Sequence, residues 1–137
     1  MDGRKQILYI DDDDDDRFLV KEAIESYGGN LELNEATSGV DGIGYLEEAI
    51  TQNNLPCLVI LDLNMPGMDG KETLLALRKD EHLKDIPVVI FTTSSSQLDK
   101  TFCDKNGVQM ITKPLDFTKL SETIKTMLGY CKGEELF

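Results

Sequence analysis

Residues 58–70 read LVILDLNMPGMDG and join an entirely aliphatic run to a turn-forming loop through the carboxylate of Asp62. Four consecutive aliphatic residues predict a short strand that is covered on both faces. A carboxylate directly after such a run is not an ordinary core residue, because burying an unpaired charge is costly. Open α/β sheets keep their ligand sites just beyond the carboxyl ends of strands. Asp62 is therefore the first candidate for a functional residue.

Five short runs predict strands, over residues 6–10, 31–36, 57–61, 87–91 and 109–112. The first, third and fourth runs are nearly all apolar, whereas the second alternates and predicts an edge strand. Apolar stripes with helical spacing separate the strands and contain Val20, Ala23, Ile24 and Tyr27; Ile43, Leu46 and Ile50; Leu74, Leu75, Leu77 and Arg78; and Phe117, Leu120, Ile124, Met127 and Leu128. The mostly polar residues 94–106 predict another helix, anchored by Leu98 and Phe102.

The alternation of strands and helices predicts a parallel sheet with helices on both faces. Right-handed crossovers leave only a few doubly wound strand orders. Gly28 and Gly29 are expected to end the first helix, and Asp116 is expected to cap the last one. A length of 137 residues predicts one domain over residues 1–137, with a core over about 6–128 and a short tail over 131–137.

The net charge of -12 argues against binding to nucleic acid or to an anionic membrane. The three cysteines, Cys57, Cys103 and Cys131, show no metal-binding spacing and are expected to be reduced, structural thiols. No basic-then-apolar leader precedes the first strand, and no apolar run approaches the roughly 18 residues of a membrane span. We therefore expect a cytoplasmic protein that is neither exported nor inserted in a membrane.

A second strand end also carries carboxylates, since Asp11 and Asp12 directly follow residues 6–10. If the two strands are neighbours, Asp11, Asp12 and Asp62 converge at one edge of the sheet. Three carboxylates at short range repel one another, so they bind a cation or one of them keeps its proton. Oxygen ligands without histidine or cysteine favour Mg²⁺ or a similar hard ion. The sequence thus predicts a magnesium site.

The unbroken aspartate run over residues 11–16 admits an alternative, a calcium loop of the EF-hand type. Four acids match ligand positions 1, 3, 5 and 12 of that loop, namely Asp11, Asp13, Asp15 and Glu22. However, position 6 is Asp16 instead of glycine, and a predicted strand takes the place of the helix that should precede the loop.

Two more strand ends place polar side chains at the same edge. Thr92 follows residues 87–91 and brings a hydroxyl, and Lys113 follows residues 109–112 and brings an ammonium. A carboxylate nucleophile, a divalent ion, a hydroxyl and a lysine suit phosphoryl transfer, because the cations neutralise charge on the transferred group. The Lys113–Pro114 bond is the candidate for a cis peptide at this site.

Four stretches together resemble the receiver domains of bacterial two-component response regulators. They are residues 7–12 (ILYIDD), 61–70 (LDLNMPGMDG), 87–92 (PVVIFT) and the pair Lys113-Pro114. The resemblance covers about residues 6–128. The pattern of Asp11-Asp12 followed by Asp15-Asp16 is similar to small stand-alone regulators found beside bacteriophytochromes.

The resemblance implies a flavodoxin-like, doubly wound five-stranded parallel sheet in the order 2-1-3-4-5. It implies that Asp62 is the phosphoacceptor. It also implies that Asp12 ligates Mg²⁺ directly, that Asp11 acts through water, and that Asn64 offers its backbone carbonyl.

For the switch, the resemblance implies that Thr92 bonds a phosphoryl oxygen and that Lys113 pairs with the phosphoryl group. The phosphoryl group would come from a histidine kinase or a histidine phosphotransfer protein. The signal would leave by protein–protein contact or phosphorelay, with the strand over residues 109–112 and its flanking helices as the output surface or homodimer contact. Such a protein catalyses only its own phosphorylation and dephosphorylation.

Two features depart from the family pattern, and one of them is that residues 107–113 look one residue short. The other is that the family often has an aromatic residue three positions before the lysine, where this chain has Met110. The sequence therefore does not show how a change at Thr92 would reach the surface.

Two other classes of protein remain open. A phosphatase of the haloacid dehalogenase type needs a carboxylate two residues after its nucleophile, where this chain has Asn64. An inert interaction module would not need Asp62 or Lys113.

Overall fold

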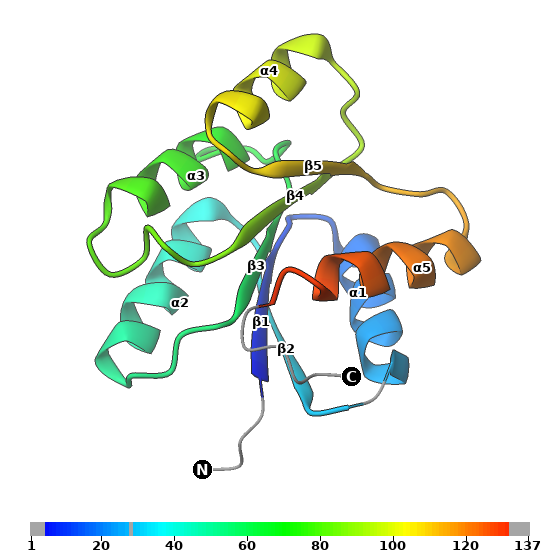
Figure 1. The fold of residues 1–137 in the computed structure, drawn as a ribbon, viewed down its shortest axis with the longest axis horizontal. Helices are drawn as coiled ribbons and strands as arrows, with labels where there is room; N and C mark the ends of the chain where they lie inside the picture. Colours follow the sequence, from blue (N-terminus) through cyan, green and yellow to red (C-terminus); the bar gives the residue numbers. More distant parts are fainter. Residues whose placement is uncertain (1–4, 28, 132–137) are drawn as a thin grey trace.

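The computed structural model describes residues 5–27 and 29–131 as an alternation of strands and helices (Figure 1). The elements are β1 (Lys5–Ile10), α1 (Asp14–Tyr27), β2 (Leu31–Ala36), α2 (Gly39–Thr51), β3 (Leu58–Leu61), α3 (Gly70–Lys79), β4 (Val88–Thr92), α4 (Gln97–Lys105), β5 (Gln109–Thr112) and α5 (Phe117–Leu128). The predicted strands agree with these bounds to within one residue at each end. Gly28 and residues 132–137, which carry one predicted helix end and most of the predicted tail, lie outside the described residues.

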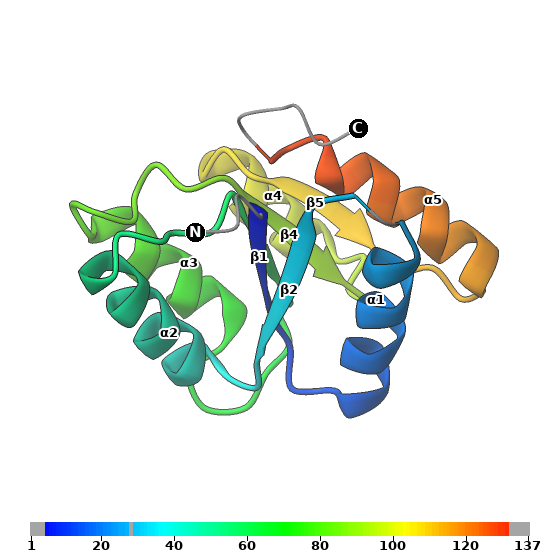
Figure 2. The same cartoon turned by 90° about the horizontal axis from the view of Figure 1, so that it is seen from below.

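The strands form one parallel sheet in the order β2-β1-β3-β4-β5, as expected. Helices α1 and α5 pack together on one face, and α2 and α3 pack together on the other (Figure 2). Helix α4 contacts β5 and contributes Cys103 to the core on the α2 and α3 side. The fold is therefore flavodoxin-like and doubly wound, with all five carboxyl strand ends at one edge.

The central strands are apolar because both of their faces are covered. Residues Ile7 and Tyr9 of β1 face α1 and α5, whereas Leu8 and Ile10 face α2 and α3, and all four are fully buried. The edge strand β2 is only partly buried over most of its length, which explains its alternating sequence.

Three residues of the predicted apolar stripes are exposed, so those assignments were wrong. Leu98 is 80% exposed in the first turn of α4, because this helix lies beside the edge strand β5 and is buried completely only at Cys103. Leu75 is exposed because it lies one helical step away from the buried Leu74. Phe117 is exposed at the first position of α5, before the buried face begins.

Capping residues mark the starts of α3 and α5. Asp116 caps α5, as predicted, by accepting a hydrogen bond of 2.8 Å from the backbone N–H of Lys119. Asp69 and Glu72 form a capping box at the start of α3. Gly29 has a φ of 74°, beyond the end of α1 at Tyr27.

Within the described ranges, no helix is both long and apolar enough to cross a bilayer.

The prediction of three reduced thiols was wrong for two of the cysteines. Cys57, just before β3, and Cys131, after α5, form a disulfide with their Cα atoms 4.9 Å apart. Cys103 is free and buried. The pairing could not be predicted because the two residues are 74 positions apart and meet only when α5 lies back along the sheet.

Reduction of this disulfide is expected to lower the free energy of unfolding by roughly 2–4 kcal/mol, because the bond constrains a long loop of the unfolded chain. Thermal unfolding with and without a reductant measures the effect. The Cys131→Ser variant is the control, since its melting temperature should not respond to the reductant. Equal melting temperatures of the oxidised and reduced wild-type protein would contradict the expectation.

Candidate functional site

Three carboxylates meet at the carboxyl edge of the sheet. Asp11 and Asp12 follow β1 and Asp62 follows β3, and the pairing of Ile10 with Leu61 places the two strand ends side by side. Ligand oxygens of Asp11, Asp12 and Asp62 all lie within 4.8 Å of one another. Asp11 and Asp62 are buried, whereas Asp12 is exposed. The predicted convergence is therefore present.

This oxygen-only set suits a hard divalent cation. Three carboxylates lie within reach of one ion. One or two of them can ligate Mg²⁺ directly while water and phosphate oxygens complete its shell. The donors contain no sulfur or imidazole, which are the ligands that softer metals prefer. The EF-hand alternative is wrong, because α1 begins at Asp14 and takes up Asp15 and Asp16 as helical residues.

Asp11 is held by four hydrogen-bond donors around its carboxylate and carbonyl. The Tyr9 hydroxyl donates to Oδ2 at 2.6 Å, and the Asp13 backbone N–H donates to Oδ1 at 2.9 Å. Lys113 Nζ donates to Oδ2 at 2.7 Å, and the Arg17 guanidinium donates to the Asp11 carbonyl at 2.7 Å. Burial and the charge of Asp11 raise the pKa of Tyr9, so the hydroxyl stays a donor.

Lys113 enters the site from the end of β5, as predicted, and its side chain is only 8% exposed. Its Nζ lies 2.7 Å from oxygens of both Asp11 and Asp16 and 3.4 Å from Asp62 Oδ2. Burial opposes the charge of Lys113, but the bonds to Asp11 and Asp16 and the charge of Asp62 outweigh it and raise its pKa. Lys113 is therefore a fixed cation. The peptide bond before Pro114 is trans, since the described residues contain no cis peptide bond.

The partners of Asp62 compensate the charge of this buried carboxylate only in part. Its burial is the largest cause that raises its carboxyl pKa, and the charge of Asp11 adds to this. Lys113, Thr92 and the backbone N–H of Asn64, which donates to Oδ1 at 3.3 Å, act in the opposite direction but do not cancel the rise. Asp62 is thus a buried carboxylate whose charge the metal-free protein tolerates poorly.

Thr92 lies buried at the end of β4, on the side of the site away from β1. Its hydroxyl oxygen accepts bonds of 3.3 Å from the Asn64 side-chain amide and from the Ser94 backbone N–H. A threonine at this position therefore links the Asp62 loop to the loop that leads into α4.

The loop after Asp62 returns close to its own origin at Gly70. A Cβ atom on Gly70 would lie 2.2 Å from the Asp62 backbone oxygen, so only glycine fits there. The Gly70 N–H donates to the Leu63 carbonyl at 3.0 Å, and α3 begins at this residue. This close approach holds the backbone on either side of Asn64.

A polar chain outside the predicted site joins α3 to α4. Lys71 Nζ lies 2.7 Å from Asp99 Oδ1 and over the Phe102 ring, 5.4 Å from its centroid. Asp99 also accepts a short hydrogen bond from the Ser94 hydroxyl, two residues beyond Thr92. Met110, where the family often has an aromatic residue, is half-buried against the core on this side of the sheet. The β4–α4 loop is therefore connected to α3 through Asp99 of α4.

Three residues of the site were missed from the sequence. Tyr9 alternates with Asp11 along one face of β1, and this period of two was the signal that could have found it. Asp16 and Arg17 reach the site from the first turn of α1, and their place depends on where that helix begins.

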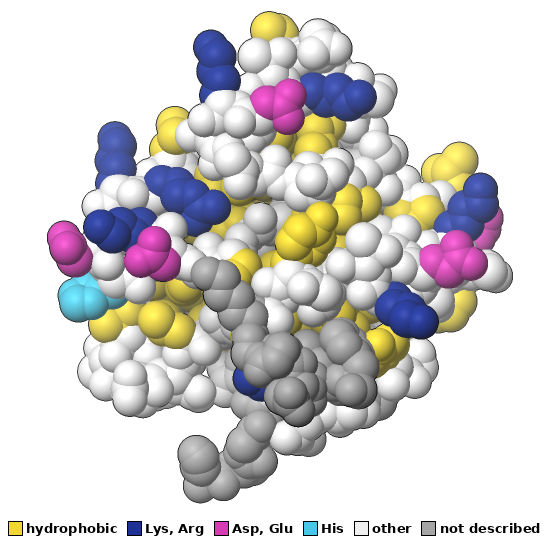
Figure 3. All heavy atoms as spheres, viewed as in Figure 1, with side chains coloured by type: hydrophobic (Ala, Val, Ile, Leu, Met, Phe, Trp, Pro, Cys, Tyr) yellow, Lys and Arg dark blue, Asp and Glu magenta, His cyan; other side chains and the backbone are white. Residues whose placement is uncertain are grey.

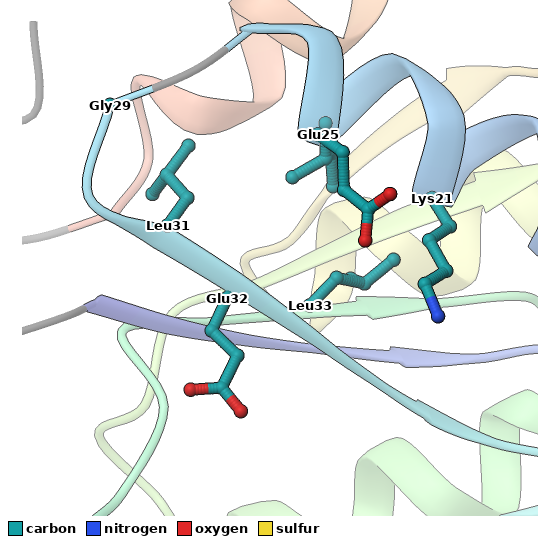
Figure 4. A pocket seen from close by; sticks show the side chains of 7 residues that line it. Lys21, Glu25, Gly29, Leu31, Glu32 and Leu33 are labelled. Carbon is teal, nitrogen blue, oxygen red and sulfur yellow. The ribbon is translucent and has the colours of Figure 1, made fainter.

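Two pockets lie away from the carboxylates of Asp11, Asp12 and Asp62. One, of about 390 Å³, lies between α1 and the edge strand β2 (Figure 4). Lys21 and Glu25 of α1 lie on the same side of β2 as Leu31 and Leu33. Glu32 points to the other side of the strand. The other pocket, of about 440 Å³, lies between α4 and β5. Neither contains a residue of the acidic site.

Comparison with known proteins agrees with this geometry. Residues 7–125 match the response regulator receiver domain. The chain is 31% identical to the protein PilH of Pseudomonas aeruginosa over 125 residues, which are 90% of this chain and 98% of PilH. The phosphorylated cyanobacterial phytochrome response regulator RcpA superposes with a TM-score of 0.85 at 28% identity, covering 96% of each chain. The Mn²⁺-bound form of the response regulator Rcp1 superposes with a TM-score of 0.82 at 28% identity, covering 97% of this chain and 99% of Rcp1.

The chain belongs to the response regulator receiver domain family. It is a phosphorylation-activated signalling switch of the two-component type, and it resembles stand-alone receiver domains over nearly its whole length.

Stability of the metal-free protein should depend on pH through Asp62. Its raised pKa means that its contribution to stability is greatest below the ordinary carboxyl pKa and is lost as pH rises through the raised value. Asp62→Asn should therefore unfold at a higher temperature than the wild type at neutral pH in a chelating buffer, and the difference should shrink toward low pH. Asp15→Asn, at an exposed carboxylate, should show no such gain. A destabilised Asp62→Asn protein at neutral pH would contradict this.

Proposed function

We propose that Asp62 is the phosphoacceptor of this receiver domain, in a reaction that requires Mg²⁺. The observation that carries the proposal is the buried Asp62 carboxylate, which lies beside two other acids and the ammonium of Lys113. A carboxylate oxygen of Asp62 attacks phosphorus, the phosphorus–nitrogen bond of a phosphohistidine breaks, and its electron pair returns to the imidazole. Hydrolysis of the acyl phosphate returns Asp62 and inorganic phosphate.

Asp12 and Asp62 are the direct ligands in this proposal, with Asp11 acting through water and Asn64 through its backbone carbonyl. The clustering of the three carboxylates and the match to Mn²⁺-bound Rcp1 support a divalent ion at this place. When bound, Mg²⁺ offsets charge on the transferred group. Asp11, held by Tyr9 and Lys113, keeps its carboxylate oriented toward the same point.

Lys113 and Thr92 have different roles. Lys113 neutralises charge on the phosphoryl group, and its position 3.4 Å from Asp62 Oδ2 supports this assignment. Thr92 carries the change outward, because its hydroxyl already bonds to Asn64 and to the backbone of Ser94 and could turn toward a phosphoryl oxygen. In this proposal, the protein promotes only its own phosphorylation and dephosphorylation.

The donor in this proposal is a histidine kinase or a histidine phosphotransfer protein, and this chain accepts the phosphoryl group in the cytoplasm. Exposed apolar side chains beside the site support a protein partner, with Phe18 and Leu19 on α1 and Leu115 and Phe117 at the start of α5. Output runs through protein contact or phosphorelay, and the face around β5, where Figure 3 shows apolar side chains at the surface, would make the homodimer or output contact. The net charge of -12 supports an output that does not involve nucleic acid or a membrane.

Acetyl phosphate with Mg²⁺ should label Asp62, and intact-mass measurement followed by peptide mapping checks this. The acyl phosphate should be sensitive to hydroxylamine, unlike a phosphoserine. Asp62→Asn should remain unlabelled, and Asp12→Asn should lose the Mg²⁺-dependent labelling because it removes a direct ligand. Asp85→Asn, on the loop before β4, is the matched control and should label like the wild type. An Asp62→Asn protein that still gains one phosphate would disprove the proposal.

Thr92→Ala should still label at Asp62 but should lose most of the structural response, since the phosphoryl group then has no hydroxyl to draw inward. Amide chemical shifts of residues 94–110 before and after addition of beryllofluoride, which mimics the phosphoryl group, measure this response. Thr93→Ala, at the exposed neighbouring threonine, should respond like the wild type. A wild-type response in Thr92→Ala would assign the transmission to another residue.

A further inference from the structure

Among the residues that the structure describes, Asp16 is the one carboxylate that bonds to Lys113 but lies outside the group of candidate metal ligands. It projects from the first turn of α1, and its Oδ2 accepts a bond of 2.7 Å from Lys113 Nζ. Its backbone N–H donates to Asp13 Oδ1 at 2.9 Å, so the start of α1 fixes its place. The bond joins α1, in the first part of the sequence, to the residue after β5, in the last part.

The ammonium of Lys113 has three N–H donors and faces three carboxylates. Two bonds of 2.7 Å, to Asp11 and Asp16, hold Nζ 3.4 Å from Asp62, the longest of the three distances. A phosphoryl group on Asp62 places new oxygens beyond the carboxylate. A bond from Lys113 to these oxygens would draw Nζ toward Asp62 and away from one of the two oxygens that it now contacts at 2.7 Å.

Asp16 is the partner that Lys113 can leave most easily. Asp11 is fully buried and is fixed by Tyr9 and by the Asp13 N–H, whereas the Asp16 side chain is 32% exposed and can be solvated. A cavity of about 30 Å³ adjoins the Asp16–Lys113 pair and is lined by Leu19, Val20, Phe91, Pro114 and Leu120 together with the pair itself. That volume is sufficient for one water molecule, which could take the place of the ammonium beside Asp16.

We propose that Asp16 is a positioning residue that holds Lys113 in its unphosphorylated arrangement and thereby opposes the phosphorylated one. Phosphorylation transfers Lys113 from Asp16 to the phosphoryl group. The strength of the Asp16 bond therefore sets how strongly the resting state is favoured. This inference rests on the proposed function, because it assumes a phosphoryl group on Asp62.

The test compares the affinity for beryllofluoride at saturating Mg²⁺ in the wild type, Asp16→Asn and Asp15→Asn. Asp15 lies in the same turn of α1, has the same charge and is exposed, so Asp15→Asn controls for the loss of one negative charge. Loss of a charge-assisted bond from the resting state should tighten binding about tenfold in Asp16→Asn. Asp15→Asn should change binding by less than about twofold, because an exposed charge is screened. Asp16→Glu, which keeps the carboxylate, should restore most of the wild-type affinity.

A double-mutant cycle shows whether Asp16 acts through Lys113. In a Lys113→Met background, Asp16→Asn should no longer tighten binding more than Asp15→Asn does. Spectra of the metal-free protein give a second measurement, in which Asp16→Asn should shift the Lys113 amide resonance and Asp15→Asn should not. If Lys113→Met binds no beryllofluoride, the spectra replace the cycle, and an unchanged Lys113 amide resonance in Asp16→Asn would overturn the role of Asp16.

The outcomes separate this inference from the proposed function. A wild-type protein that neither binds beryllofluoride nor labels at Asp62 would overturn the proposed function. A wild-type protein that does both, with Asp16→Asn equal to Asp15→Asn, would overturn only the role of Asp16. An equal tightening by Asp16→Asn with and without Lys113 would also overturn that role, because Asp16 would then act as a simple repulsive charge.

Discussion

The ion-pair cluster around Lys113 is the interaction on which the rest of the site depends. One ammonium bonds to Asp11, after β1, and to Asp16, on α1, and lies near Asp62, after β3. Without it, the buried carboxylates would repel one another in a medium that screens charge poorly. The cluster thus lets the protein keep acids at neighbouring strand ends, where the topology of a parallel sheet brings them together.

The fold and most of the site could be predicted because both follow from local patterns. Carboxyl ends of parallel strands meet at one edge, so Asp11 and Asp62 had to be close once their strands were neighbours. The disulfide between Cys57 and Cys131 could not be predicted, because it depends on how α5 lies against the sheet. Asp16 was missed for a related reason, since its direction depends on the phase of α1 and not on its place in an acidic run.

The link from the site to the molecular surface is built from polar contacts instead of a large side chain. Thr92 bonds to the Ser94 backbone, and the Ser94 hydroxyl bonds to Asp99, which pairs with Lys71 of α3. Met110 instead packs against the core on the α2 and α3 side, as a flexible apolar residue. In the proposed switch, a movement of the β4–α4 loop would disturb the ion pair between Lys71 of α3 and Asp99 of α4, so both helices would take part.

The hydrogen bond between Tyr9 and Asp11 couples the site to tyrosine fluorescence. The chain has no tryptophan and four tyrosines, so its ultraviolet emission comes from tyrosine alone. Tyr9 is the fully buried one, and its hydroxyl donates directly to a carboxylate of the acidic cluster. Any event that changes the charge on Asp11 also changes the environment of this fluorophore, so the unmodified protein contains its own optical sensor of the site.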